Sequence, residues 1–156
     1  MPKPKPSTVY IAVDPGAKGG IAIRDGSSVV TMPFEDGQIP AEVHAHADAG
    51  RFAFIVVERS QATIPRFRAH RADAKKAGEA IRKMFPRRNR LVFVDPNHWQ
   101  GSLGVVGAKN TKGFSYSEYS RRLLGGHKDH TENEHAARCI LHWAEKVGVW
   151  EDNRGA

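Results

Sequence analysis

Two acidic side chains stand directly after strongly apolar segments of this sequence. Asp14 follows the run Thr8–Val13, and Glu58 follows the run Phe52–Val57. A carboxylate beside a buried strand is costly unless its charge is paired or used. If the two strands are neighbours in a sheet, both carboxylates project at the same edge. Their oxygens would then suit a hard cation such as Mg²⁺.

Each of these carboxylates also has a purely structural interpretation. Asp is favoured in turns, and Asp14 precedes Pro15-Gly16. Glu58 could be a solvent-facing strand end paired with Arg59 or another base. Their shared position at strand ends favours the metal hypothesis, because metal-assisted cleavage of a phosphodiester needs acidic groups gathered on rigid elements.

A glycine-rich turn follows the first of the two acids. Gly16, Gly19 and Gly20 predict a tight turn and the close approach of a second backbone, for which a DNA strand is one hypothesis. An Asp-x-Gly turn between strands also occurs in actin-like ATP-binding proteins. Those proteins need two domains, which disfavours this alternative for 156 residues.

The chain is basic, with 24 Lys and Arg against 17 Asp and Glu, a formal charge of +7 and a pI of about 9.8. The basic residues cluster in Arg66–Arg71, Arg82–Arg90 and Lys109–Lys112. Such an excess attracts polyanions, although a solvated basic surface has the same composition. Together with a carboxylate site, it predicts a nucleic-acid substrate.

The elements that would position these residues alternate in type. Strands are expected at Thr8–Val13, Gly20–Arg24, Ser28–Met32, Phe52–Val57 and Leu91–Val94. Helices are expected at Gln38–Ala49, at Arg66–Phe85, from Ser115 to Gly125-Gly126, and at Glu132–Val147. The basic helix shows no wide apolar stripe, whereas Phe52–Val57 has the continuous apolar character of an interior strand. This order predicts an α/β fold, a mixed five-stranded sheet with helices on both faces.

Other features of the sequence limit the class of protein. No apolar run is long enough for a membrane helix, and the N-terminus lacks the apolar region of a signal peptide. Cys139 is the only cysteine, so we expect a buried, reduced thiol and a cytoplasmic protein. We expect a single domain over residues 8–150, with disordered tails at 1–7, which is basic, and 151–156.

Four segments in order resemble the motifs of RuvC-type Holliday junction resolvases, especially the phage-like branch, within the RNase H-like superfamily. These segments are Ile11–Ile23, Phe54–Gln61, Val92–Gly101 and Gly107–Lys112, and the resemblance covers roughly residues 8–147. It implies an RNase H-like fold, a homodimer and paired nicks across a four-way DNA junction in a bacterial or phage-infected cell. It also implies two Mg²⁺ ions, with Mn²⁺ as a substitute, bound by Asp14 and Glu58.

The resemblance also points to ligands at the start of the last helix, where the family usually places two acidic residues, or His and Asp, three apart. Alignment on Ala136-Ala137 selects Glu132 and His135, and Asp129 is the first substitute. Glu134 instead fits a capping box. The alternatives are first-turn charges favoured by the helix dipole and a surface histidine.

The remaining site residues are basic or aromatic. The resemblance implies that Lys109 or Lys112 contacts the phosphate near the cut, and a mobile basic loop is the alternative. For Trp99 we favour core packing over stacking on a base. The residues expected to contact DNA are Lys18, Arg59, Arg66, Arg68, Arg71, Lys75, Lys109 and Lys112.

Two other functions remain open at this point. One is an RNase H-fold nuclease that acts on flaps, forks or RNA–DNA hybrids. The other is a noncatalytic nucleic-acid-binding module, which the altered last motif favours. Fold alone does not distinguish them.

Overall fold

A mixed five-stranded sheet organises the chain in this computed structural model, which describes residues 7–16, 18–35, 37–59, 68–85, 89–103, 105–106 and 114–148. The strand order is β3-β2-β1-β4-β5. β1, β2 and β3 form an antiparallel meander, and β4 and β5 add to β1 in parallel. The strands are β1 (Thr8–Asp14), β2 (Lys18–Asp25), β3 (Ser28–Glu35), β4 (Phe52–Glu58) and β5 (Arg90–Val94).

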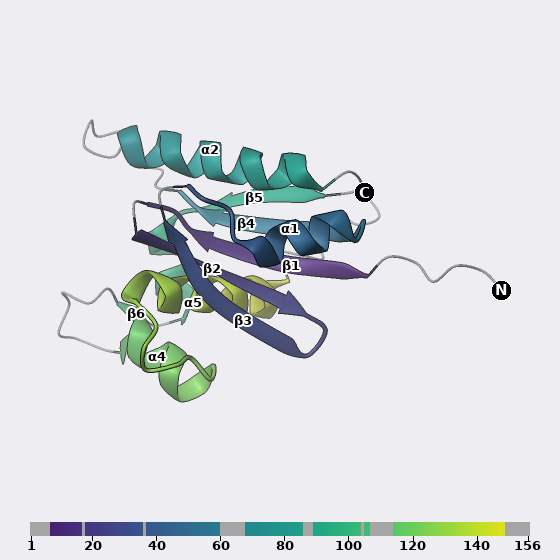
Figure 1. The fold of residues 1–156 in the computed structure, drawn as a ribbon. Helices are drawn as coiled ribbons and strands as arrows, with labels where there is room; N and C mark the ends of the chain where they lie inside the picture. The colour runs from purple at the N-terminus through teal and green to yellow at the C-terminus, as the bar shows by residue number, and fades with distance from the viewer. Residues whose placement is uncertain are drawn as a thin grey trace.

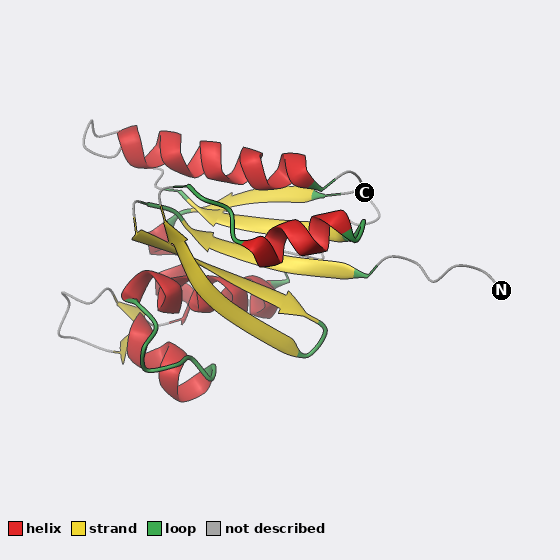
Figure 2. Ribbon diagram, viewed as in Figure 1, coloured by secondary structure: helices red, strands yellow, loops and turns green. Residues whose placement is uncertain are grey.

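Helices cover both faces of this sheet (Figures 1 and 2). One face carries α1 and α2, and the other carries α5, against which α4 packs. The helices are α1 (Ala41–Asp48), α2 (Arg68–Met84), α3 (Pro96–Leu103), α4 (Tyr116–Leu123) and α5 (Glu132–Val147). Two short parallel strands, β6 (Val105–Val106) and β7 (Phe114–Ser115), lie outside the main sheet. The predicted α/β architecture is confirmed.

The strands divide the core into two clusters because successive side chains of a strand point to opposite faces. Ile11, Val13 and Val57 pack with α1 and α2. Ala12 and Val56 pack on the other face with α5. β4 is an interior strand, as its apolar run predicted.

Helix α2 differs from the prediction, because it does have an apolar stripe. Ala74, Ala77, Gly78 and Ile81 are buried at helical spacing on one face. The stripe is inconspicuous in sequence because three of its four members are small. A side-chain carbon at Gly78 would lie 3.0 Å from a methyl carbon of Leu91, so small residues let α2 lie close to the sheet. Most of the charged residues of α2 are exposed, among them Lys75, Lys76 and Arg82.

Helix α3 was not predicted. Its first residue is Pro96, which suits that position because a helix leaves its first N–H groups without partners in any case. Asp95 accepts the backbone N–H of Asn97 at 2.9 Å, as a capping side chain does. Gly101 within the segment lowers its helix propensity, which hid the helix from a prediction by periodicity.

Helix α5 forms as predicted, and its ends explain why. Thr131 and Glu134 make a full capping box, and Gly148 ends the helix in the left-handed region with φ of 73°. Cys139 is buried in this helix, and burial raises the pKa of its thiol to about 12, which agrees with the expected core cysteine. None of the described helices is long and apolar enough to cross a membrane.

Candidate active site

Asp14 and Glu58 are the last residues of β1 and β4, so their carboxylates lie at the same end of the sheet. β1 and β4 are parallel, and Val13 pairs with Val57, so the next residue of each strand is one of these acids. Alternation places both side chains on the face of Ala12 and Val56, beneath α5. The convergence that the sequence predicted is therefore present. That these two residues bind metal stays a prediction.

Burial gives this pair unusual protonation behaviour. Asp14 is only 7% exposed, and burial, followed by the charge of Glu58, raises its pKa well above the ordinary value. Burial also raises the pKa of Glu58 to about 7; a hydrogen bond from Trp99 opposes this shift and the charge of Asp95 adds to it. Two desolvated acids in one place make the dianion unfavourable, and a bound cation would offset that charge.

Trp99 is a direct partner of Glu58. Its side chain is fully buried, and its Nε1–H donates a hydrogen bond of 2.8 Å to Oε2 of Glu58. The expected packing role of this tryptophan is confirmed. The hydrogen bond was not predicted, because it depends on α3 bringing residue 99 back over the end of β4.

Asp95 is a third acid at this edge that sequence reasoning missed. Glu58 pairs with Val94 of β5, so Asp95 comes one residue beyond that pair. Its charge raises the pKa of Glu58, which places the two carboxylates within electrostatic reach. The signal was the one used for Asp14, an acid directly after an apolar strand, here Leu91–Val94.

The glycines after Asp14 serve contacts within the protein. A side-chain carbon at Gly20, the partner of Asp14 in β2, would lie 2.5 Å from both Asn133 O and Glu134 Cα. At Gly19 it would lie 2.3 Å from the carbonyl oxygen of Asp14. At Gly20 the close backbone approach is thus made by α5, whereas the space beside Gly16 is open and the approach of a DNA strand there stays a prediction. The approach at Gly20 brings the first turn of α5 beside the strand that pairs with Asp14.

The C-terminal candidates on and before this turn have different surroundings. Glu132 and Asp129 are exposed, and Glu134 is buried as the capping-box residue. His135 is 3% exposed, and its Nδ1 lies 2.8 Å from Oγ of Ser120 on α4. The His135 ring therefore contacts α4.

The electrostatic surroundings of His135 agree with this contact. Burial lowers its pKa, as do the neighbouring charges of His130 and Arg121, so the ring is neutral near pH 7. Asp14 and Glu58 are not among the described groups that shift this pKa. In the described part of the chain, no group of three or more His, Cys, Asp and Glu side chains could hold a metal ion. Metal binding by Glu132, His135 or Asp129 stays a prediction.

The pair of acids nevertheless fits a hard divalent cation. Mg²⁺ in nucleotide-processing sites is commonly held by one or two carboxylates, with waters and substrate phosphates in the other positions. Asp14 and Glu58 supply two oxygen-bearing groups whose raised pKa values show that their charge is poorly compensated by the protein alone. The donor set therefore suits Mg²⁺ or Mn²⁺.

The residues expected to contact DNA fall in several places. Lys18 is exposed at the start of β2, and the Arg59 guanidinium lies 5.0 Å from the centre of the Phe93 ring. On α2, Arg68 and Lys75 are exposed and Arg71 is half-buried. The other expected contacts lie outside the described residues, and they are Arg66, Lys109 and Lys112.

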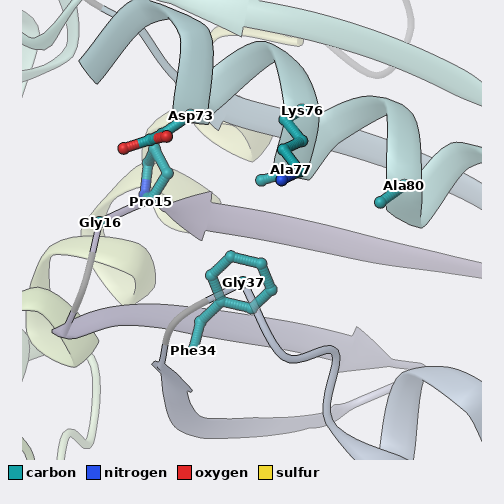
Figure 3. A pocket seen from close by; sticks show the side chains of 8 residues that line it. All are labelled: Pro15, Gly16, Phe34, Gly37, Asp73, Lys76, Ala77 and Ala80. Atoms are coloured by element: carbon teal, nitrogen blue, oxygen red, sulfur yellow. The ribbon is translucent and has the colours of Figure 1, made fainter. Parts of the chain in front are cut away.

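A cavity of about 410 Å³ lies near the same turn but on the face of α2. Figure 3 shows Asp73 and Lys76 of α2 across from Pro15 and the ring of Phe34. Phe34 belongs to the core cluster of α1 and α2, whereas the two acids point to the opposite face. The carboxylate pair is therefore separate from this cavity.

Comparison with known proteins identifies the fold. No family model and no curated protein sequence matches this chain. It is similar to a Thermus thermophilus RuvC structure, with a TM-score of 0.54 and 14% identity over 90% of this chain and 96% of that one. It is also similar to T. thermophilus RuvC in complex with Holliday junction substrate, with a TM-score of 0.50 and 11% identity over 90% and 97%. The chain has an RNase H-like fold. More particularly, it has the arrangement of that fold found in RuvC.

Proposed function

We propose that this protein is a Mg²⁺-dependent endodeoxyribonuclease that nicks four-way DNA junctions. The observation that carries the proposal is the pairing of buried Asp14 with half-buried Glu58 at the strand ends of a RuvC-like fold. A similar structure is RuvC in complex with Holliday junction substrate, which supports branched DNA as the substrate. The motifs also support a relation to the phage-like branch of these resolvases.

In the proposed mechanism, Asp14 and Glu58 hold the cation at the sheet edge. A bound Mg²⁺ would supply Lewis-acid activation of a water molecule and of the scissile phosphate. The protein itself holds the two carboxylates at the ends of neighbouring strands, and Trp99 donates a hydrogen bond to one of them.

The basic residues would supply affinity and orientation. Lys18 and the exposed bases of α2 can bind phosphates, and such contacts fix the orientation of DNA without reading its sequence. We also propose a homodimer, because two sites related by a two-fold axis would place paired nicks across a junction.

The test is the incubation of the purified protein with a labelled four-way junction, with and without Mg²⁺, followed by mapping of the nicks. Asp14→Asn and Glu58→Gln should each lower the nicking rate at least about a hundredfold, since each removes a ligand charge. Asp48→Asn changes an exposed acid of α1 and serves as the matched control. Nicking that survives both site substitutions would contradict the proposal.

A noncatalytic nucleic-acid-binding module is the second candidate. It is favoured by the finding that, among the described residues, no three His, Cys, Asp or Glu side chains lie together so that they could hold a metal ion. This candidate predicts junction binding without nicking at any Mg²⁺ or Mn²⁺ concentration.

A nuclease of this fold could also prefer another substrate. Parallel nicking assays with flaps, forks and RNA–DNA hybrids would show whether one of these is cut faster than the four-way junction.

A further inference from the structure

We infer that Trp99 is a positioning residue that holds the carboxylate of Glu58 in one orientation toward Asp14. The inference rests on the proposed function for its effect on nicking, but its structural part can be tested without any activity. The observation is the hydrogen bond of 2.8 Å from the Trp99 indole N–H to Oε2 of Glu58.

The two partners of this hydrogen bond differ greatly in freedom. Trp99 is fully buried and packs in the same core cluster as Val56, two residues before Glu58 on β4, and Val94, the last residue of β5. A tryptophan has only two side-chain torsions, and close packing fixes both. Glu58 has three torsions of its own, so a fixed donor decides which way its carboxylate turns.

Helix α3 connects Trp99 to the end of β5 and so sets the position of the indole. Asp95 directly follows β5, and its side chain and carbonyl oxygen accept the N–H groups of Asn97 and His98 at 2.9 and 3.0 Å. The ring of His98 meets the ring of Trp143 edge-on at 5.6 Å. The first turn of α3 is therefore held against both β5 and α5, and Trp99 follows on that turn.

A second tryptophan provides a matched comparison. Trp143 is also buried, at 4% exposed, and belongs to the same core cluster. Its Nε1 is buried without a hydrogen-bond partner in the described structure. Packing alone thus does not require an indole N–H to be bonded in this core. Trp99→Phe and Trp143→Phe remove similar apolar volume, but only the first removes the hydrogen bond to Glu58.

The structural test is the NMR signal of each indole N–H in ¹⁵N-labelled protein, assigned from the Trp→Phe variant that lacks it. Glu58→Ala should move the Trp99 signal and speed its exchange with solvent, while the Trp143 signal stays in place. Addition of Mg²⁺ alone to the wild-type protein should also move the Trp99 signal. A Trp99 signal that is indifferent to both changes would overturn the inference.

The functional test is a Mg²⁺ titration of junction nicking. Trp99→Phe should raise the half-saturating Mg²⁺ concentration about tenfold, the usual scale for a residue that orients a metal ligand, with a smaller loss of rate at saturating Mg²⁺. Trp143→Phe keeps an aromatic ring for His98 to contact and removes no hydrogen bond to Glu58, so it should leave this concentration unchanged. Equal effects of the two substitutions, in variants with wild-type folded spectra, would assign Trp99 a packing role only and reject the inference.

The outcomes for the two proposals are separable. If the wild-type protein does not nick DNA, the proposed function fails, and the indole signals of the wild-type protein and of Glu58→Ala still decide whether Trp99 holds Glu58. If nicking is present but depends equally on both tryptophans, the proposed function stands and this inference fails. If Trp99→Phe does not fold, the response of the wild-type indole signal to Mg²⁺ decides.

Discussion

At the scale of single residues, the candidate site depends on two acids at the ends of neighbouring strands, where burial removes much of their contact with water. Asp14 and Glu58 end neighbouring parallel strands, and their side chains share one face of the sheet. Burial raises the pKa of each, so the metal-free protein retains protons there that the unfolded chain would release. Stability, and the metal binding proposed for these two acids, should therefore both depend on pH.

We predict that the free energy of unfolding of the metal-free protein falls as pH rises. Glu58 has an ordinary pKa of 4.5 and a folded pKa of about 7, so its stabilising proton is fully present below pH 4.5 and lost as pH passes 7. The loss is on the order of 1–3 kcal/mol. Denaturant unfolding between pH 4.5 and 8 measures it, and Asp14 adds a change of the same sign.

Glu58→Gln should reduce this pH dependence, whereas Glu42→Gln, at an exposed acid of α1, should not. Saturating Mg²⁺ should restore stability at pH 8 in the wild-type protein, because a cation bound only to the folded state shifts the equilibrium. A flat pH profile in the metal-free protein would contradict the assigned protonation.

At the scale of elements, the site depends on how closely α5 approaches β2. Gly20 lies opposite Asp14, and the backbone of Asn133 and Glu134 occupies the space that a side chain at Gly20 would need. The capping box of Thr131 and Glu134 fixes the first turn of α5 at this same place. Gly20 and this capping box together fix the position of the first turn of α5, which carries Glu132 and Glu134.

We predict that Gly20→Ala lowers the free energy of unfolding by about 1–3 kcal/mol, because the added carbon overlaps the α5 backbone. Gly101→Ala is the matched control, since a side-chain carbon there meets open space in a helix. That control should be neutral or stabilising by up to about 1 kcal/mol. Equal unfolding midpoints for the two variants would show that α5 does not pack as described.

We also predict that Thr131→Ala lowers stability by about 1 kcal/mol, because it removes the acceptor of the Glu134 N–H bond. Thr131→Ser retains the hydroxyl and should be less destabilising. Thermal unfolding of the two variants in parallel measures the difference. A Ser variant that is as unstable as the Ala variant would exclude the cap as the cause.

At the scale of the whole molecule, several basic residues lie at the end of the sheet that holds Asp14. Lys18 begins β2 there, Arg59 follows β4, and α2 begins at Arg68 (Figure 1). At the other end Arg24 is bonded to Glu145 of α5, and the last turn of α2 adds exposed Arg82 and Lys83. Only the first group lies at the end of the sheet that holds the two acids, so we expect a polyanion held there to meet the site.

We predict that the double substitution Arg68→Gln, Lys75→Gln weakens junction binding and reduces its salt dependence. Removal of each phosphate-binding charge should lower the slope of log affinity against log salt by about 0.9. Filter binding or fluorescence anisotropy without divalent metal measures this slope. Lys146→Gln, in the last turn of α5, is the matched control and should leave the slope unchanged. A slope that is equally insensitive to both changes would place DNA on another face.

Much of this arrangement is written locally in the sequence. The apolar runs before Asp14 and Glu58 and the capping box of α5 are short-range patterns, and each was recognisable because its physical cause lies within a few residues. The predicted order of elements, the two helical layers and the convergence of the two acids follow from them. The buried stripe of α2 was missed because small residues carry little hydrophobic signal.

The partners of the candidate site residues could not be predicted from local patterns. The hydrogen bond of Trp99 to Glu58 joins residues 41 positions apart, and the contact of His135 with Ser120 joins α5 to α4. Such contacts depend on which elements pack together, and a local sequence pattern does not specify that. Local patterns were sufficient to predict the two acids at the strand ends, whereas their surroundings depend on contacts between distant parts of the chain.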